Sequence, residues 1–212
     1  MRVLVALAAL LVSSGTPDVR NLILQPTQVG TGYQLLARTD GFGVKNTVTL
    51  DLCGVKNYPS EKLRTTRLQV NYGAKGTKLG LSNEVVTYKT GGAQQAMREV
   101  TQHATHCPTT PVVTGEAGVP PLRFTITRVS DSRLLKGYLA VRVRARGTVT
   151  ANGKTQKVDQ ISYAIYQSLG NVLSGTYSYG PNTAGQLAFA LHAAEQSGQN
   201  LERGHSIGSP VA

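Results

Sequence analysis

The chain has 212 residues, of which 40% are hydrophobic, so it can bury a core and is not a disordered tail. Its 22 Lys and Arg residues outnumber its 11 Asp and Glu residues, which gives a formal net charge of +11 and a pI of about 9.9. Such a charge favours anionic surroundings, but it identifies no partner by itself.

The N-terminal residues 1–15 match the order of a secretory signal peptide. Met1-Arg2 supplies a positive start, Val3 to Val12 is an unbroken apolar run, and Ser13-Ser14-Gly15 is a small-residue exit. The run is shorter than the roughly 20 apolar residues that a membrane-spanning helix needs. The alternative is a buried N-terminal strand or helix. We expect a secreted or cell-envelope protein, for which wall polymer or lipid headgroups are more probable anionic partners than nucleic acid.

Only two cysteines are present, Cys53 and Cys107. Export from the cytoplasm permits disulfides, and two cysteines in an exported chain favour a bond between them. The alternative is two separate buried thiols.

Periodicity predicts the elements of the N-terminal half. Short helices are expected over 18–24 and 26–29, glycine-marked loops (Gly30, Gly32, Gly41 and Gly43) around the segment 33–37, and strands over 47–52, 67–72 and 84–88. A helix is then expected to begin at a cap on Thr90 or Gly92 and to run to Cys107. Its apolar stripe consists of Ala93, Ala96, Met97, Val100, Ala104 and Cys107.

Strands dominate the following part of the chain. They are expected over 123–129, 138–150, 157–169 and 172–179, with a hairpin turn at Asn152-Gly153. A final helix is expected from residues 180–183 onward, burying Ala184, Leu187, Ala188, Leu191 and Ala194. These elements predict one α+β domain over residues 16–202, an antiparallel sheet with amphipathic helices packed on one face, followed by a flexible tail over 203–212.

The order of elements and two stretches resemble a known exported module. They are Leu50-Asp51-Leu52-Cys53-Gly54 with Tyr58-Pro59-Ser60, and Glu84 to Tyr88 followed by Gly91-Gly92-Ala93 and a helix ending in Cys107-Pro108. The closing strand and final helix fit as well. The chain is therefore similar to the extracellular sensor domain of actinobacterial PknH-type serine/threonine kinases and to related secreted or lipid-anchored proteins.

This resemblance implies an α+β fold, a Cys53–Cys107 disulfide and a ligand-holding cleft between sheet and helices, but it supplies no ligand. Family members often carry a second bridge near the last two strands, where this chain instead has residues 163–166 and 177–179.

No motif for catalysis or cofactor binding is visible. The sequence has no nucleophile elbow, P-loop, dinucleotide fingerprint or spaced carboxylate pair that indicates catalysis, so we expect a non-enzyme without a cofactor. His103 and His106 are spaced to share a metal, but no third ligand is evident, and surface histidines explain them better. No metal site is predicted.

Two clusters remain as candidate binding residues. Tyr163, Tyr166, Tyr177 and Tyr179 suit an amphipathic ligand in the cleft, although core packing would also explain them. Arg142, Arg144 and Arg146 lie on one strand face and suit a polyanion, although a solvated face that discourages edge pairing would also explain them. The leading hypothesis is a non-catalytic, ligand-binding sensor-like domain; the alternative is a structural envelope protein that docks on anionic polymer or membrane through these arginines.

Overall fold

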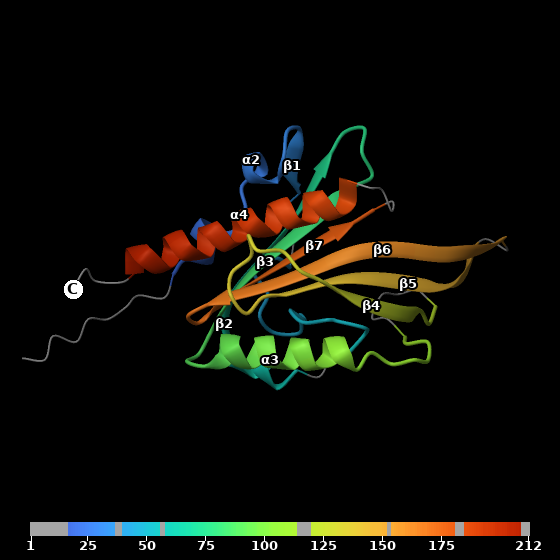
Figure 1. Cartoon of the computed structure of the whole chain (residues 1–212), viewed down its shortest axis with the longest axis horizontal. Helices are drawn as coiled ribbons and strands as arrows, with labels where there is room; N and C mark the ends of the chain where they lie inside the picture. Colours follow the sequence, from blue (N-terminus) through green and yellow to red (C-terminus); the bar gives the residue numbers. More distant parts are fainter. Residues whose placement is uncertain are drawn as a thin grey trace, which may run out of the picture.

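A computed structural model of the chain describes residues 17–36, 40–55, 58–113, 120–151, 154–180 and 185–208. The expected signal peptide, the Asn152-Gly153 turn and the start of the final helix lie outside these residues. A seven-stranded antiparallel sheet forms the centre, in the order β1-β2-β3-β7-β6-β5-β4 (Figure 1). Its strands are β1 (Tyr33–Leu36), β2 (Arg64–Ala74), β3 (Gly80–Tyr88), β4 (Arg123–Val129), β5 (Leu139–Ala151), β6 (Lys154–Leu169) and β7 (Val172–Tyr179).

The helices lie on both sides of this sheet. They are α1 (Val19–Leu22), α2 (Pro26–Val29), α3 (Gly92–Thr105) and α4 (Gly185–Gly208), together with a 3-10 turn, η1 (Pro59–Leu63). Helix α3 packs on one side, which we call the α3 face; α1, α2 and α4 pack on the other, the α4 face (Figure 1). The predicted α+β class is confirmed, but the expectation that the helices share one face is wrong.

Alternate residues of single strands explain the two covered faces. On β6, Ala164 and Tyr166 belong to the core beneath α3, whereas Ile161, Tyr163 and Ile165 belong to the core beneath α4. Successive side chains of a strand point to opposite faces, so a strand with apolar residues in both rows requires cover on both sides.

Helix α3 begins as the chain leaves β3. Its N-cap is Gly91, in the left-handed conformation with φ 79°, rather than the expected Thr90 or Gly92. A side chain at Gly92 would collide with Tyr88 and crowd Leu63, so the glycine pair allows the helix to start close to the sheet. The helix ends at Thr105, and Cys107 lies just beyond it.

The segment 47–52, expected as a strand, has no neighbouring strand. Leu50 and Leu52 are buried, but the only bridge in this stretch is the local one from Leu52 to Val55. The amides of Thr49 and Leu50 donate instead to the Glu61 carboxylate. The alternation of apolar and polar residues in this segment therefore reflects burial of one side of an extended chain that does not pair with the sheet. Conversely, the segment between the glycine-marked loops, for which no element was predicted, contains strand β1.

Helix α4 is longer than the sequence indicated. It continues to Gly208, into the segment expected as a tail, because Leu201 is buried and Gly204 lies against Leu22 of α1. Its buried side includes Leu191 and Ala194 as expected, but Ala188 is exposed.

Candidate functional site

Helix α3 covers only part of the α3 face. It packs over parts of β3, β5, β6 and β7, including Val86, Leu173 and Tyr166, and a loop of residues 40–55 lies over the same face. Two concavities lie where this loop crosses the sheet, with volumes of about 560 Å³ and 450 Å³. Because both are bordered by Asp51, Tyr177 and Tyr179, we treat them as two ends of one groove. These volumes are typical of small-molecule sites.

The larger end of the groove is polar. It is bordered by loop residues, including Asp40, Asn46 and Thr47, and by strand residues of β2 and β3. The strand side carries Arg67, Gln69, Asn71, Ser82 and Glu84. Among the described residues of this end, three carry carboxyl groups (Asp40, Asp51 and Glu84) and one carries a guanidinium, Arg67.

Glu84 is a buried carboxyl of this end whose pKa is strongly raised. It is fully buried, and desolvation raises its pKa to about 7, although the Arg67 charge and hydrogen bonds from Arg67 and Thr49 act in the opposite direction. Arg67 Nε and Thr49 Oγ1 both donate to Glu84 Oε1. The one guanidinium among the described residues of this end is therefore bound to a carboxyl group of the same end.

The smaller end is mainly apolar. Its walls are the groove-facing residues of β4, β5 and β6 and the turn that holds the disulfide. They include Leu122, Phe124, Val143, Ala145, Ala164 and Cys53. An apolar chain can therefore lie at one end of the groove while a polar group lies at the other.

Three of the four predicted tyrosines meet in this groove. Tyr166 and Tyr177 contact edge to face, with ring centroids 5.6 Å apart, and the Tyr177 hydroxyl donates to the Thr49 carbonyl at 3.2 Å. Tyr166 is only 1% exposed, whereas Tyr179 is 39% exposed. Burial raises the pKa values of the Tyr166 and Tyr177 hydroxyls well above the ordinary value, so both remain neutral.

Tyr163 does not join this set. Its side chain packs on the α4 face with Ile161 and Ile165, and its neighbours Ser162 and Ala164 face the groove. Only its main chain can therefore border the apolar end. Of the four tyrosines expected to share a cleft, only Tyr166, Tyr177 and Tyr179 place their side chains at the groove.

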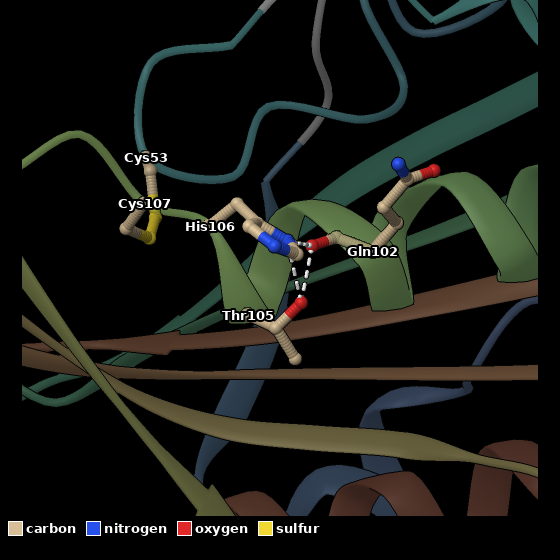
Figure 2. The surroundings of a disulfide bond; sticks show 5 residues. All are labelled: Cys53, Gln102, Thr105, His106 and Cys107. Atoms are coloured by element: carbon tan, nitrogen blue, oxygen red, sulfur yellow. Dashed lines mark hydrogen bonds between the residues drawn. A yellow bond between two sulfur atoms is a disulfide. The ribbon is translucent and has the colours of Figure 1, made fainter.

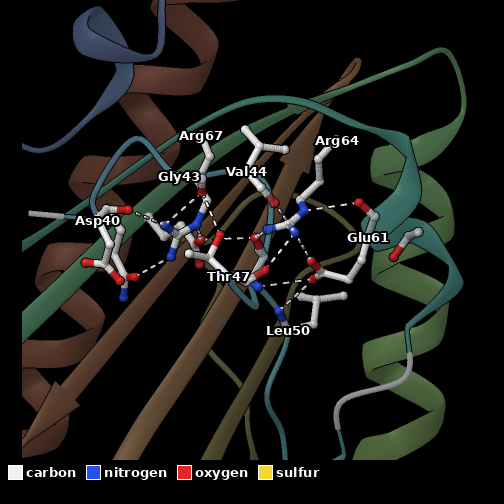
Figure 3. Close-up of polar contacts among 12 residues, drawn as sticks. Asp40, Gly43, Val44, Thr47, Leu50, Glu61, Arg64 and Arg67 are labelled. Carbon is white, nitrogen blue, oxygen red and sulfur yellow. Dashed lines mark hydrogen bonds and ion pairs between the residues drawn. The ribbon is translucent and has the colours of Figure 1, made fainter.

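Two arginines of β2 hold the loop that walls the polar end (Figure 3). Arg64 Nη2 donates to the carbonyls of Val44 and Thr47, both at 2.7 Å, and pairs with Glu61 Oε2 at 2.7 Å. Arg67 Nη1 donates to the Asp40 carbonyl at 3.2 Å and to the Gly43 carbonyl at 3.3 Å. Buried guanidinium groups thus supply the hydrogen bonds that an irregular loop cannot obtain from a neighbouring strand.

The same loop is tied to α3 by the Cys53–Cys107 disulfide (Figure 2). The two Cα atoms are 5.6 Å apart, within the range of ordinary disulfides. The bond joins the turn at the apolar end of the groove to the segment just after α3. The expected pairing is confirmed.

The predicted basic row lies away from the groove. Arg142, Arg144 and Arg146 alternate with Val141, Val143 and Ala145 on β5, so they point to the opposite side of the sheet. Strand β5 lies between β4 and β6 and is not an edge. Protection of a sheet edge therefore does not explain these arginines.

The two histidines at the C-terminal end of α3, His103 and its C-cap His106, have ordinary contacts. The His103 ring contacts Tyr58 edge-on, and His106 Nδ1 lies 3.0 Å from the Gln102 carbonyl (Figure 2). Among the described residues, no group of three or more His, Cys, Asp or Glu side chains is placed to hold a metal ion. None of the described helices has the length and apolar character needed to cross a bilayer.

Sequence reasoning missed the buried pair at the polar end. Arg67 and Glu84 were assigned to strands without a role, and Asp51 was used only as part of a family-like stretch. A signal was present, since Glu84 is the single acid in a strand that is otherwise uncharged, and Arg67 lies in a neighbouring predicted strand.

Comparisons with known proteins bear on the fold. No family model and no curated protein sequence matches the chain. Among solved structures, the chain is similar to the extracellular domain of PknH from Mycobacterium tuberculosis, with a TM-score of 0.56 and 15% sequence identity. The alignment covers 87% of this chain and 98% of that domain. The two proteins share a fold across nearly the whole of the extracellular domain.

Proposed function

We propose that this chain is an exported, non-catalytic, sensor-like domain that binds an amphipathic small molecule in the groove of the α3 face. The observation that carries the proposal is the junction of a polar and an apolar concavity at Tyr177 and Tyr179. The fold shared with the extracellular domain of PknH supports a sensor role.

The groove favours a particular kind of ligand. Among the described residues that border the polar end are the carboxyl side chains of Asp40, Asp51 and Glu84 and one guanidinium, that of Arg67, which is paired with Glu84. A cationic or hydroxyl-rich group suits these acceptors, and an anionic group would be repelled. The apolar part of the ligand would lie toward Phe124 and Val143, where burial of apolar surface contributes most of the binding energy.

Two single-chain surfactants of opposite charge test the proposal. We expect decyltrimethylammonium to bind below its micelle concentration at least about tenfold more tightly than decyl sulfate, measured by calorimetry and by shifts of groove amide signals in NMR spectra. Equal binding of both, or shifts outside the groove, would contradict it.

Matched tryptophan variants distinguish groove binding from surface adsorption. Ala145→Trp fills the apolar end of the groove, whereas Thr125→Trp adds the same bulk on an exposed position of the opposite face. We expect the first to abolish binding and the second to leave it unchanged. An equal loss of binding in both variants would exclude the groove as the binding site.

Export is tested separately. The N-terminal run and the disulfide support it, and we expect protein recovered from the cell envelope or culture medium to begin near residue 16. Recovery only from the cytoplasm, with Met1 retained, would contradict this part of the proposal.

A further inference from the structure

The same three strands that wall the apolar end of the groove carry cations on their other side. Strand β4 contributes Arg123 to this side, and β6 contributes Lys157 and Asp159. One end of the β5–β6 hairpin extends beyond both long helices (Figure 1). Arg123, Arg146, Lys157 and Asp159 are exposed, whereas Arg142 and Arg144 are half-buried where α4 begins to cover the sheet. We call this surface the basic face; it consists of Arg123, Arg142, Arg144, Arg146, Lys157 and Asp159.

The register places like charges directly opposite one another. Arg123 is the cross-strand partner of Arg146, and like charges at such positions destabilise a sheet. Asp159 is the only acid in the three strands, and it pairs with Arg144 at 2.5 Å. Among the described residues, no carboxylate lies within ion-pair distance of Arg123, Arg142, Arg146 or Lys157.

We propose that the basic face is a second binding site, for a linear phosphate-bearing polymer, independent of the ligand groove. Residues two apart on a strand are spaced by about 6.6 Å, so Arg142 to Arg146 form a straight row of roughly 13 Å. A chain of anionic groups can follow this row and neutralise several cations together, with release of counterions.

The exposed side chains favour a polymer over a membrane or a nucleic acid. The exposed large hydrophobic residues of the described chain lie elsewhere, so the basic face has no apolar group to insert into a bilayer. Its aromatic neighbour, Tyr163, is 8% exposed beneath α4 and is not available to stack on bases.

A charge-removal series tests the site with long-chain inorganic polyphosphate as the probe. Arg123→Gln, Arg142→Gln and Arg146→Gln together should weaken binding by about tenfold or more and reduce the slope of log affinity against log salt by roughly two. The matched control is Lys75→Gln, Lys78→Gln and Lys89→Gln, which removes the same charge from exposed positions elsewhere and should change binding by less than about threefold. Equal loss in both would reduce the effect to net charge and overturn the proposal.

A variant with an expected gain of affinity distinguishes loss of the binding site from loss of folding, because misfolding would not increase binding. Asp159→Asn releases Arg144 and should tighten polyphosphate binding by up to about fivefold, whereas Glu202→Gln on α4, with the same charge change, should not. No gain from Asp159→Asn would overturn the assignment. Binding to vesicles that contain anionic phospholipid is measured in parallel. Binding to these vesicles without binding to polyphosphate would show that the basic face recognises a membrane and would overturn the proposal of a polymer site.

Discussion

Arg67 and Glu84 form an ion pair across β2 and β3 in which only 2% and 1% of the two side chains are exposed. Removing two charges from water is costly, and hydrogen bonds from the guanidinium to loop carbonyls and from the Thr49 hydroxyl to Glu84 offset only part of this cost. The pair therefore joins the floor of the groove to its wall. It also makes stability depend on pH.

We predict that the stability contributed by Glu84 decreases as the pH rises. Burial raises its pKa from the ordinary 4.5 to about 7, so the folded protein retains this proton after the unfolded chain has lost it. The free energy of unfolding should therefore fall between about pH 4.5 and pH 7, by up to roughly 3 kcal/mol. Urea unfolding of the wild type and of Glu84→Gln across this pH range measures the contribution of Glu84. The difference between the two free energies of unfolding removes the contributions of all groups that titrate equally in both proteins.

The control for this experiment is Glu202→Gln, an exposed carboxyl on α4. The free energy of unfolding of Glu202→Gln should change with pH in parallel with that of the wild type. A wild-type curve parallel to that of Glu84→Gln would show that Glu84 does not hold a raised pKa.

Arg64 should determine how firmly the groove wall is held. Arg64→Lys keeps the charge but loses the planar fork that reaches the carbonyls of Val44 and Thr47. We expect a loss of roughly 2 kcal/mol and faster amide hydrogen exchange over residues 44–50, with the β3 and β7 amides unchanged. Arg98→Lys on the exposed side of α3 is the matched control and should exchange like the wild type.

The disulfide should contribute strongly to stability. It closes a loop with a sequence separation of 54, for which chain entropy gives roughly 4 kcal/mol. Cys53→Ser with Cys107→Ser should lower the free energy of unfolding by about this amount in denaturant titrations. Reductant should destabilise the wild type to a similar extent and leave the double variant unaffected. If the variant and the wild type unfold together under oxidising conditions, the entropic account fails.

The close approach of α1 and α4 gives a test of the α4 face. A methyl group at Gly204 would overlap the Leu22 side chain, so Gly204→Ala should destabilise the protein by about 1–3 kcal/mol. Gly185 lies in the same helix with open space around it, and Gly185→Ala should be neutral or slightly stabilising. Thermal unfolding of the two variants compares them directly, and equal effects would contradict the packing of α1 on α4.

The fold class and the disulfide could be predicted from the sequence, but the face of the sheet that each helix covers could not. Apolar periodicity identified α3 and most strands because each has a buried side. It could not show that α3 and α4 cover opposite faces, since apolar residues such as Ile165 and Tyr166 are adjacent in sequence and only the three-dimensional arrangement assigns each its helix.

The groove was predictable only in part. Tyr166, Tyr177 and Tyr179 could be selected by residue type, but Tyr163 could not be excluded until its strand register was known. The sequence did not indicate that the loop 40–55 forms a wall of the groove. The backbone hydrogen bonds of this loop are made with the side chains of Arg64, Arg67 and Glu61, which lie outside the loop in the sequence. Such side chain–main chain bonds leave no periodic pattern.

The contact between Leu22 and Gly204 brings the two ends of the described chain together on the α4 face, on the side of the sheet opposite the groove. A tether attached to an exposed residue of α4 near this contact would therefore hold the molecule with the groove turned outward, so the α4 face is the side by which to immobilise the protein for ligand screening.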